Sequence, residues 1–377
     1  MLKFFSFILA FLTAVSNFCW GAISGIGFGI TVEPSVFECG DCYAVMWVTS
    51  GKGSGCEVAL HRDRNTYNGE EKTVWDSRSG AIASDDTIHV VKVSKNELIG
   101  NEYKVVSQSV TYKFGYFAIK GKTVESDTYF FGGIPKDDDI KILSISDIHE
   151  LEKKMMKAVS HIDVQPDLIV LLGDIPSKMT SKKNFITILE DANMLSGGKV
   201  PVLYVRGNHE TRGEFASQLA DYFPTSTGEL YFTFDFGALS AAVLDTGEDK
   251  SDDHREYSGL VDFESYRRQE FEWINSLDSS DLGGKYRIVF SHMPNIEDHF
   301  GMNWIKPFAE LDASLFVTGH LHMVDFIDGE PPIVIGGGKI DGGDDFGVTM
   351  LTLHDGKIDI KTVNVDGDIL LSKTVDA

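Results

Sequence analysis

The sequence predicts an α/β domain preceded by a smaller all-β sandwich. After residue 140, short apolar segments alternate with amphipathic ones, as strands and helices do in α/β proteins. Before residue 135 the chain consists of short alternating segments separated by turns, without the 3.6-residue period of a helix. Between them, Ile134–Asp139 combines a proline with three consecutive aspartates, which suits a linker better than a strand or a core.

The composition limits the class of protein. The chain has 377 residues, of which 42% are hydrophobic and 24% charged, a globular mixture that excludes intrinsic disorder, collagen-like repeats and a multi-span membrane protein. The formal charge is −23, from 34 basic and 57 acidic residues. This charge disfavours binding to nucleic acid or to anionic membranes, so a polyanionic substrate would need positive charge supplied locally.

Residues 1–22 are predicted to be a signal peptide. Lys3 precedes the apolar run Phe4–Val15, and small residues follow near Cys19. The run is too short to span a bilayer, so we expect a secreted, periplasmic or cell-surface protein with no transmembrane span after signal removal. An uncleaved anchor is the alternative. Asn17 and Phe18 argue against lipid attachment at Cys19.

Signal removal leaves three cysteines, Cys39, Cys42 and Cys56. In an oxidising compartment, one disulfide and one spare thiol are the simplest arrangement, and three pairings are open. A zinc site that combines the three with His61 is the alternative.

The first module is expected to occupy residues 23–135 and the second domain residues 136–377. The strands predicted for the first are Tyr43–Thr49, Cys56–Leu60, Thr87–Val93, Tyr103–Val110, Tyr112–Ile119 and Thr128–Phe131. Those predicted for the second are Ile140–Ser146, Leu168–Leu172, Val200–Val205, Ile288–Phe290, Leu315–Val317 and Ile333–Ile335, with helices at Leu151–His161 and Phe185–Leu195.

Five apolar strands of the second domain end in polar residues that can bind a metal. The motifs are Asp147-Ile148-His149, Gly173-Asp174, Gly207-Asn208-His209-Glu210, Ser291-His292 and Gly319-His320-Leu321-His322. One such motif is weak evidence of a site, but the ordered set holds five of the eleven histidines. Strand ends of an α/β sheet meet at one edge, where such folds bind ligands. Imidazoles, carboxylates and an amide oxygen, without a thiolate, suit an open catalytic site for manganese, iron or zinc.

The order of these motifs resembles that of the calcineurin-like metallophosphoesterase superfamily, across roughly Lys136 to Ala377. The strands of the front half resemble, more loosely, the fibronectin-like domain of purple acid phosphatases. The resemblance implies a four-layer αββα sandwich, with helices outside two sheets and two divalent metal ions at the sheet edge. The front module would be a fibronectin-like or immunoglobulin-like sandwich.

The resemblance also implies a role for each residue. The first metal would be held by Asp147, His149, Asp174 and His322, and the second by Asp174, Asn208, His292 and His320. Asp174 would bridge the two ions, whose shared water, as hydroxide, attacks phosphorus. His209 would act beside the metals without ligating them, with Glu210 as an orienting partner.

Two positions differ from purple acid phosphatases. Those enzymes have glycine where this chain has His149, and tyrosine where it has Ser177, so their coloured iron–tyrosinate pair is not expected here. The catalytic half therefore resembles the wider superfamily.

Other residues near the motifs have two interpretations each. Arg206 is interpreted either as a contact to a substrate phosphate or as a partner in a salt bridge. The loop residues are interpreted either as part of the rim of the site or as solvated side chains; they are His254, Asn295, Glu297 and His299. Asp341, Asp344 and Asp345 lack the EF-hand spacing and favour a solvated turn over a calcium site.

The predicted function is hydrolysis of small phosphate esters by a dinuclear metal site. A phosphodiesterase or nucleotidase on the same core is the first alternative, because loops such as Glu248–Gly259 and Pro294–Asn303 decide what flanks the phosphate. An inactive surface or carbohydrate-binding protein is the second. The intact set of ligand residues counts against it, because an inactive relative is expected to have lost one of them.

Overall fold

The computed structural model describes residues 2–51, 54–61, 71–135, 137–245, 247–248, 250–294, 301–342 and 344–377. Contacts divide the chain into two units, each treated by itself below. The first consists of Met1–Val36, Tyr43–Gly132 and Gly197–Lys199, and the second of Phe37–Cys42, Gly133–Ser196 and Val200–Ala377.

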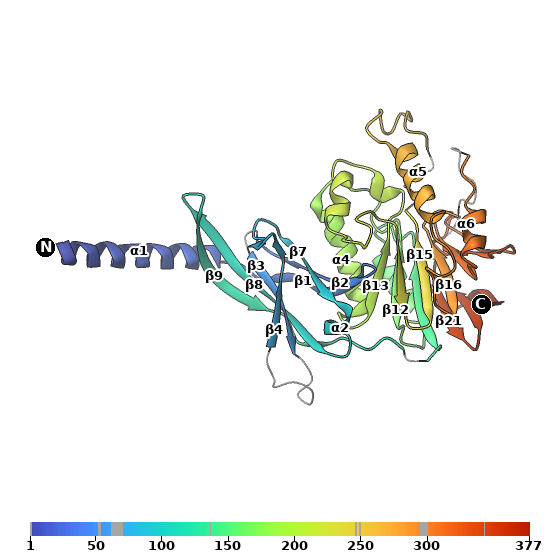
Figure 1. The fold of residues 1–377 in the computed structure, drawn as a ribbon, viewed down its shortest axis with the longest axis horizontal. Coiled ribbons are helices and arrows are strands. Elements are labelled where there is room, and N and C mark those ends of the chain that lie inside the picture. Colours follow the sequence, from blue (N-terminus) through green and yellow to red (C-terminus); the bar gives the residue numbers. More distant parts are fainter. Residues whose placement is uncertain are drawn as a thin grey trace. The chain divides into compact units, whose positions relative to one another are not determined.

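The first unit is built mainly of strands (Figure 1). The elements of this part of the chain are α1 (Leu2–Ser24), β1 (Ile30–Glu38), β2 (Cys42–Thr49), β3 (Ser54–His61), β4 (Glu71–Trp75), β5 (Ser77–Arg78), β6 (Ala81–Ile82), β7 (Ile88–Ser94), α2 (Lys95–Leu98), β8 (Glu102–Lys113), β9 (Phe117–Glu125) and β10 (Tyr129–Phe130). Strands β1, β2 and β7 are neighbours, and β10, β8, β3 and β4 form a second sheet in which β9 pairs with β8. Alternate residues of both sheets enter one core around Trp47, whose indole nitrogen donates to Ser107 Oγ at 2.8 Å.

One strand predicted in this unit is wrong. The segment Tyr112–Ile119 is split between two antiparallel strands, because β8 continues to Lys113 and β9 begins at Phe117. Phe114 and Gly115 have positive φ values of 56° and 77°, which turns the chain between them. The alternation of apolar residues continues across this turn, so the pattern alone does not reveal it.

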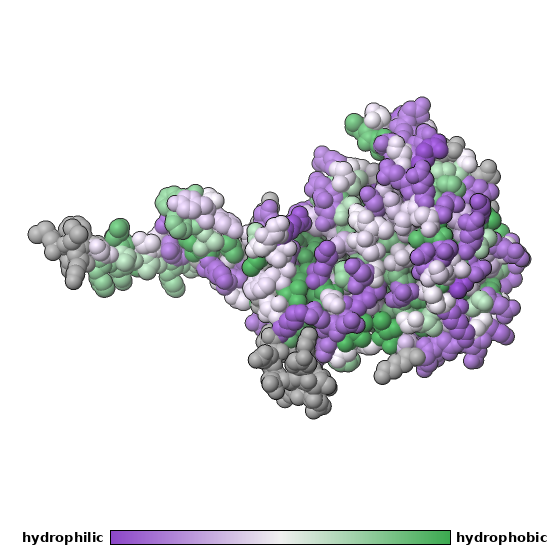
Figure 2. Space-filling view, in the orientation of Figure 1, coloured by the Kyte–Doolittle hydropathy of each residue, from purple (hydrophilic) through white to green (hydrophobic). Residues whose placement is uncertain are grey.

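Apolar side chains stay exposed on α1 and at the β8–β9 turn of the first unit (Figure 2). Phe114 is 78% exposed, and Lys113 Nζ donates to Ser16 Oγ of α1 at 2.9 Å. Among the described residues, no helix has both the length and the apolar character that a membrane crossing requires. The signal peptide at residues 1–22 stays a prediction.

Cys39 and Cys42 form a disulfide, with their Cα atoms 5.5 Å apart. This bond joins the two ends of the turn between β1 and β2. It also uses two of the thiols that the alternative zinc site would need. The side chains of Cys56 and His61 lie outside the part of the chain that the structure describes.

The second unit contains two mixed sheets with helices packed against them (Figure 1). Its elements are β11 (Ile140–Ile145), α3 (Glu152–Val159), β12 (Leu168–Leu172), α4 (Lys182–Ser196), β13 (Pro201–Val205), the 3-10 helices η1 (His209–Thr211) and η2 (Ala216–Asp221), β14 (Phe232–Phe236), β15 (Leu239–Val243), α5 (Phe263–Ile274), β16 (Tyr286–Phe290), α6 (Ile305–Glu310), β17 (Leu315–Thr318), β18 (Val324–Ile327), β19 (Ile333–Gly336), β20 (Gly338–Lys339), β21 (Phe346–His354), β22 (Lys357–Val363) and β23 (Ile369–Asp376). All six strands and both helices predicted here are confirmed to within a few residues.

The two sheets of this unit share one apolar core. In the first, the strand order is β23-β22-β21-β11-β12-β13, and in the second it is β14-β15-β16-β17-β19-β18. Fully buried side chains from both sheets meet between them, among them Ile142, Val170, Leu351, Ala241, Ile288 and Val317. Helices α5 and α6 cover β15, β16 and β17 through a second cluster around Trp304 and Phe308. Each strand is therefore held firmly up to its last residue, where the polar motifs begin.

Asp191 is an unpaired carboxyl on the buried face of α4. It is fully buried, and neither of its oxygens has a hydrogen-bond partner among the described residues. Burial, and then the negative charge of Glu152, raises its pKa to about 8. The folded protein therefore keeps the proton of Asp191 up to about pH 8, whereas an unfolded chain releases it near pH 4.

Because the folded state binds this proton more tightly, the proton contributes stability at low pH. This contribution to the free energy of unfolding is lost as the pH rises from about 4 to 8. The change Asp191→Asn is expected to raise the free energy of unfolding by about 1–3 kcal/mol at pH 8, and by little at pH 4. Urea unfolding followed by circular dichroism at both pH values measures this difference. Glu190 is unsuitable as a control because its charge also raises the pKa of Asp191, so the exposed Glu272 of the same unit provides the control variant Glu272→Gln. An equal gain in the free energy of unfolding at the two pH values would contradict a raised pKa for Asp191.

Candidate metal centre

The predicted motifs lie at matching ends of neighbouring parallel strands. In the first sheet β11, β12 and β13 run parallel, so the residues that follow them, Asp147, Asp174 and Asn208, come together. In the second sheet β16 and β17 run parallel, and His292 and His320 follow them. This is the edge at which α/β sheets bind ligands.

Two glycines allow the loops to approach one another. A Cβ atom at Gly207 would collide with the carboxylate and backbone nitrogen of Asp174, and one at Gly173 would lie 2.6 Å from His292 Nδ1. Gly173 also has a φ of 83°, which favours glycine, whereas Gly207 is required by close packing alone. Glycine is therefore required at both positions, for two different reasons.

Five candidate ligands have a left-handed backbone. Their φ values are 47° for Asp147, 46° for His149, 55° for Asp174, 69° for His320 and 49° for His322. Non-glycine residues in this region cost roughly 1–3 kcal/mol each, and such residues gather at functional sites. This backbone turns the side chains out of the strand direction and toward a common point.

One group of side chains joins the first and last motifs. His322 Nε2 lies 3.3 Å from Asp147 Oδ1 and 3.2 Å from His149 Nε2. His149 Nε2 is also 3.9 Å from Asp147 Oδ1. These three ligand atoms lie within 4.8 Å of one another, close enough to contact one ion.

A second group contains Asp174, His292, His320 and Asn208. Asp174 Oδ2 lies 3.2 Å from His292 Nε2, and the Asn208 amide lies 3.1 Å from both Asp174 Oδ2 and His320 Nδ1. Asp174 Oδ2 is also 3.8 Å from His149 Nε2 of the first group. Asp174 therefore lies between the two groups.

The charges in this region fit a bound cation. Asp147 Oδ1 is buried and has no hydrogen-bond partner among the described residues, although three imidazoles lie around it. Burial alone would lower the pKa of His292, but the carboxylates of Asp174 and Asp147 raise it to about 10. These carboxylates therefore favour a positive charge at this position. Burial lowers the pKa of His320 to about 4 and also lowers that of His149, so both imidazoles are neutral and can ligate a metal.

Hydrogen bonds to neighbouring residues orient two of the imidazoles. His292 Nδ1 donates to the Leu172 carbonyl at 2.7 Å, and His322 Nδ1 lies 3.1 Å from Asp341 Oδ1. In both residues this leaves Nε2 facing the carboxylates, which is the usual arrangement of metal-binding histidines. Asp341 belongs to the acidic turn that sequence reasoning considered only as a calcium site or a solvated loop.

Glu210 has a different role from the predicted one. It accepts hydrogen bonds from the backbone nitrogens of Gly207, Asp174 and Ile175, at 3.0, 3.0 and 2.8 Å. The prediction that it orients His209 is wrong, because its oxygens are turned to these three N–H groups. Glu210 instead ties the second motif to the third.

His209 is held between a carbonyl and an arginine that the sequence did not identify. Its Nδ1 donates to the Ser177 carbonyl at 2.7 Å, and its Nε2 accepts from Arg212 Nη1 at 2.9 Å. Arg212 in turn donates through Nε and Nη2 to Glu248, at 3.1 and 2.8 Å. His209 Nε2 is only 3.8 Å from Asp174 Oδ2, but its lone pair already serves Arg212.

The structure decides between the two interpretations for some of the other residues near the motifs. Arg206 forms a salt bridge with Asp245 at 2.8 Å, the second of its two interpretations. His254 makes a local contact, with its Nδ1 3.3 Å from the backbone nitrogen of Glu256. Asn295, Glu297 and His299 lie outside the described residues.

The segment that carries these residues is similar to known proteins. Residues 140–324 match the family model of the calcineurin-like phosphoesterases. A curated relative, the serine/threonine-protein phosphatase CPPED1 of Danio rerio, is 27% identical over 190 residues, covering 46% of this chain and 59% of the relative. The chain thus spans about three fifths of that relative. The solved structure of PhoD aligns over 91% of this chain and 88% of its own, with a TM-score of 0.51 and 11% identity, which shows a shared fold.

Proposed function

We propose that the chain, whose residues 140–324 match the family model of the calcineurin-like phosphoesterases, hydrolyses small phosphate esters with two divalent metal ions. The observation that carries the proposal is the position of Asp174 between two groups of ligand atoms. The first ion would contact Asp147, His149, Asp174 and His322, and the second Asp174, Asn208, His292 and His320. The metal is manganese, iron or zinc on the chemistry of the donors.

Two bound ions would lower the pKa of a shared water and neutralise charge on the phosphoryl group. The protein's own contribution is orientation. Asp341 and the Leu172 carbonyl fix two imidazoles, and Glu210 fixes the loops that carry Asp174 and Asn208. Arg212, which donates to His209 Nε2, supplies the local positive charge that a phosphate requires in a chain of charge −23.

We also propose that the chain is exported after loss of residues 1–22. Residues 23–135 would form a fibronectin-like module, and residues 136–377 a four-layer catalytic domain. The supporting observations are the apolar start of the chain, the strand-rich first unit, and the helices packed against the two sheets of the second.

A combined metal and substrate assay tests the function. Residues 23–377 are purified, their metal content is measured, and hydrolysis of p-nitrophenyl phosphate is compared with that of bis(p-nitrophenyl) phosphate. We expect bound metal and turnover that is lost on chelation and restored by manganese, iron or zinc. Preference for the second compound would support the phosphodiesterase alternative. Tightly bound metal without turnover of either ester would favour the binding protein.

A further inference from the structure

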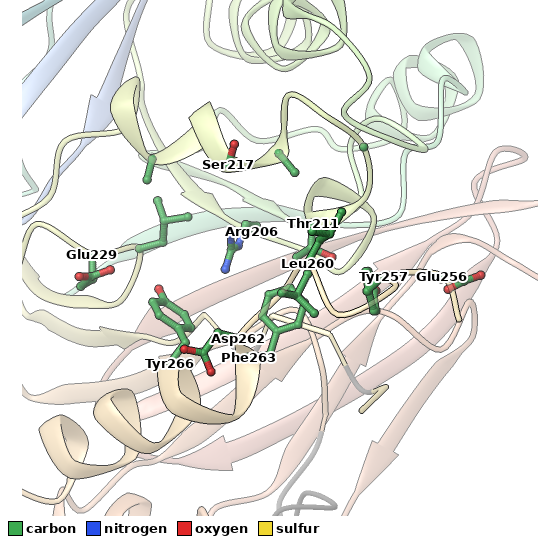
Figure 3. Close-up of a pocket in the computed structure, with 15 residues that line it drawn as sticks. Arg206, Thr211, Ser217, Glu229, Glu256, Tyr257, Leu260, Asp262, Phe263 and Tyr266 are labelled. Carbon is green, nitrogen blue, oxygen red and sulfur yellow. The ribbon is translucent and has the colours of Figure 1, made fainter. Parts of the chain in front are cut away.

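A cavity of 520 Å³ lies in the second unit, outside the metal centre. Its wall comes from Arg206, from the 3-10 helices η1 and η2, and from the segment that leads into α5. Figure 3 shows Asp262, Phe263 and Tyr266 on one side, Ser217 across from them, and Arg206 between. A cavity of this volume is large enough for a small organic ligand.

The cavity is connected to the metal centre by a chain of hydrogen bonds. The hydroxyl of Tyr257, in the cavity wall, donates to Glu248 Oε2. The same oxygen accepts from Arg212 Nη2 at 2.8 Å, and Arg212 Nη1 lies 2.9 Å from His209 Nε2. In addition, Thr211 in the wall donates through Oγ1 to the Asn208 carbonyl at 2.7 Å. The cavity wall is therefore linked, through Tyr257 and Glu248, to Arg212 and His209 beside the metal centre.

The wall combines aromatic rings with negative charge. Tyr257, Phe263 and Tyr266 contribute rings, and the Arg206 guanidinium already lies over that of Tyr266, 5.6 Å from its centroid. Apolar atoms dominate the lining. Arg206 is the one basic residue of the lining, and Asp245 neutralises it through contacts of 2.8 and 2.9 Å.

Three acidic residues complete the lining. Glu256 is balanced in part by Lys250, 3.6 Å away. Within the described part of the chain, no basic side chain pairs with Glu229 or Asp262. The lining therefore carries more negative than positive charge, on acidic side chains that are exposed, and this disfavours an anionic ligand.

We propose that this cavity binds an organic cation of the quaternary ammonium type, with its charge against the rings of Tyr257 and Phe263 and the carboxylates of Glu229 and Asp262. Aromatic rings attract such cations, and nearby carboxylates add to the attraction. If the proposed function holds, the cation is part of the alcohol that the phosphate esterifies. The substrate class is then a phosphate ester of an amino alcohol.

Calorimetric titration tests the cavity without any need for turnover. Choline is compared with 3,3-dimethylbutan-1-ol, which has the same shape but no charge. We expect the full chain to bind choline about 10-fold more tightly. The double change Glu229→Gln with Asp262→Asn should remove most of this preference. Glu264→Gln is the matched control, because Glu264 lies in the same first turn of α5 but does not line the cavity. Equal affinity for the two compounds, or a preference that survives the double change, would overturn the proposal.

A kinetic comparison separates this inference from the proposed function. The substrates are phosphorylcholine and its analogue without the cationic nitrogen, 3,3-dimethylbutyl phosphate, and the measured product is inorganic phosphate. We expect a KM about 10-fold lower for the cationic ester, and a loss of the difference in the double variant. Hydrolysis of both esters with equal KM would overturn the inference and leave the function standing. Selective choline binding without hydrolysis of any ester would support the cavity and count against the function.

Discussion

Replacing Asp174 by alanine is expected to reduce phosphoester turnover by roughly three orders of magnitude or more and to lower the bound metal. Asp174 Oδ2 is 3.2 Å from His292 Nε2 and 3.8 Å from His149 Nε2, so one substitution removes a ligand atom from both groups. Burial would raise the pKa of Asp174, but His292 and His209 lower it below its ordinary value, so the carboxylate is ionised and available to a cation at neutral pH.

Metal analysis and turnover are measured together on the Asp174→Ala variant, with urea unfolding to confirm that it folds. Asp163→Ala is the control, because Asp163 is an exposed aspartate of the same unit that lies outside the site. We expect the control to keep both its metal and its activity. Full metal content in Asp174→Ala would show that this carboxylate does not hold the ions.

The variant His209→Ala is expected to lose turnover by roughly 10²–10³-fold and to keep its metal. The Nε2 lone pair of His209 is used by Arg212, and its Nδ1 donates to the Ser177 carbonyl, so neither nitrogen is free to ligate. Under the proposed function, we expect the ring to act beside the metals, next to the substrate's phosphate and its leaving group.

Metal content and kcat, measured on the same preparation, distinguish the two roles of this histidine. His209 Nε2 lies close enough to Asp174 and His149 to be a ligand by distance alone. A variant that loses metal in proportion to its activity would make His209 a ligand and refute the proposed role.

The strand ends could be predicted because the signal is local. An apolar run followed by Asp147 or His292 reports both the strand and the polar residue at its end. Arg212 and Glu248 could not be predicted, because they are 36 residues apart and meet only through the fold. The Tyr112–Ile119 error arose because an alternating pattern can pass through a tight turn unchanged.

The cavity could not be predicted from the sequence, for a similar reason. Its wall comes from separate segments between Arg206 and Tyr266, none of which has a recognisable motif. Sequence reasoning identified the loop at Glu248–Gly259 as one that decides specificity, and that loop does supply Tyr257 to the wall.

The left-handed backbone of Asp147, His149, Asp174, His320 and His322 affects how this protein could evolve. Glycine adopts such a backbone without strain, so a change of one of these residues to glycine would relieve its backbone cost. This gain offsets part of what is lost with the side chain, for example the hydrogen bond from His320 N to Asp147 Oδ2. A descendant freed from selection for turnover would therefore lose less stability by changing these residues to glycine than by changing buried polar residues with an ordinary backbone.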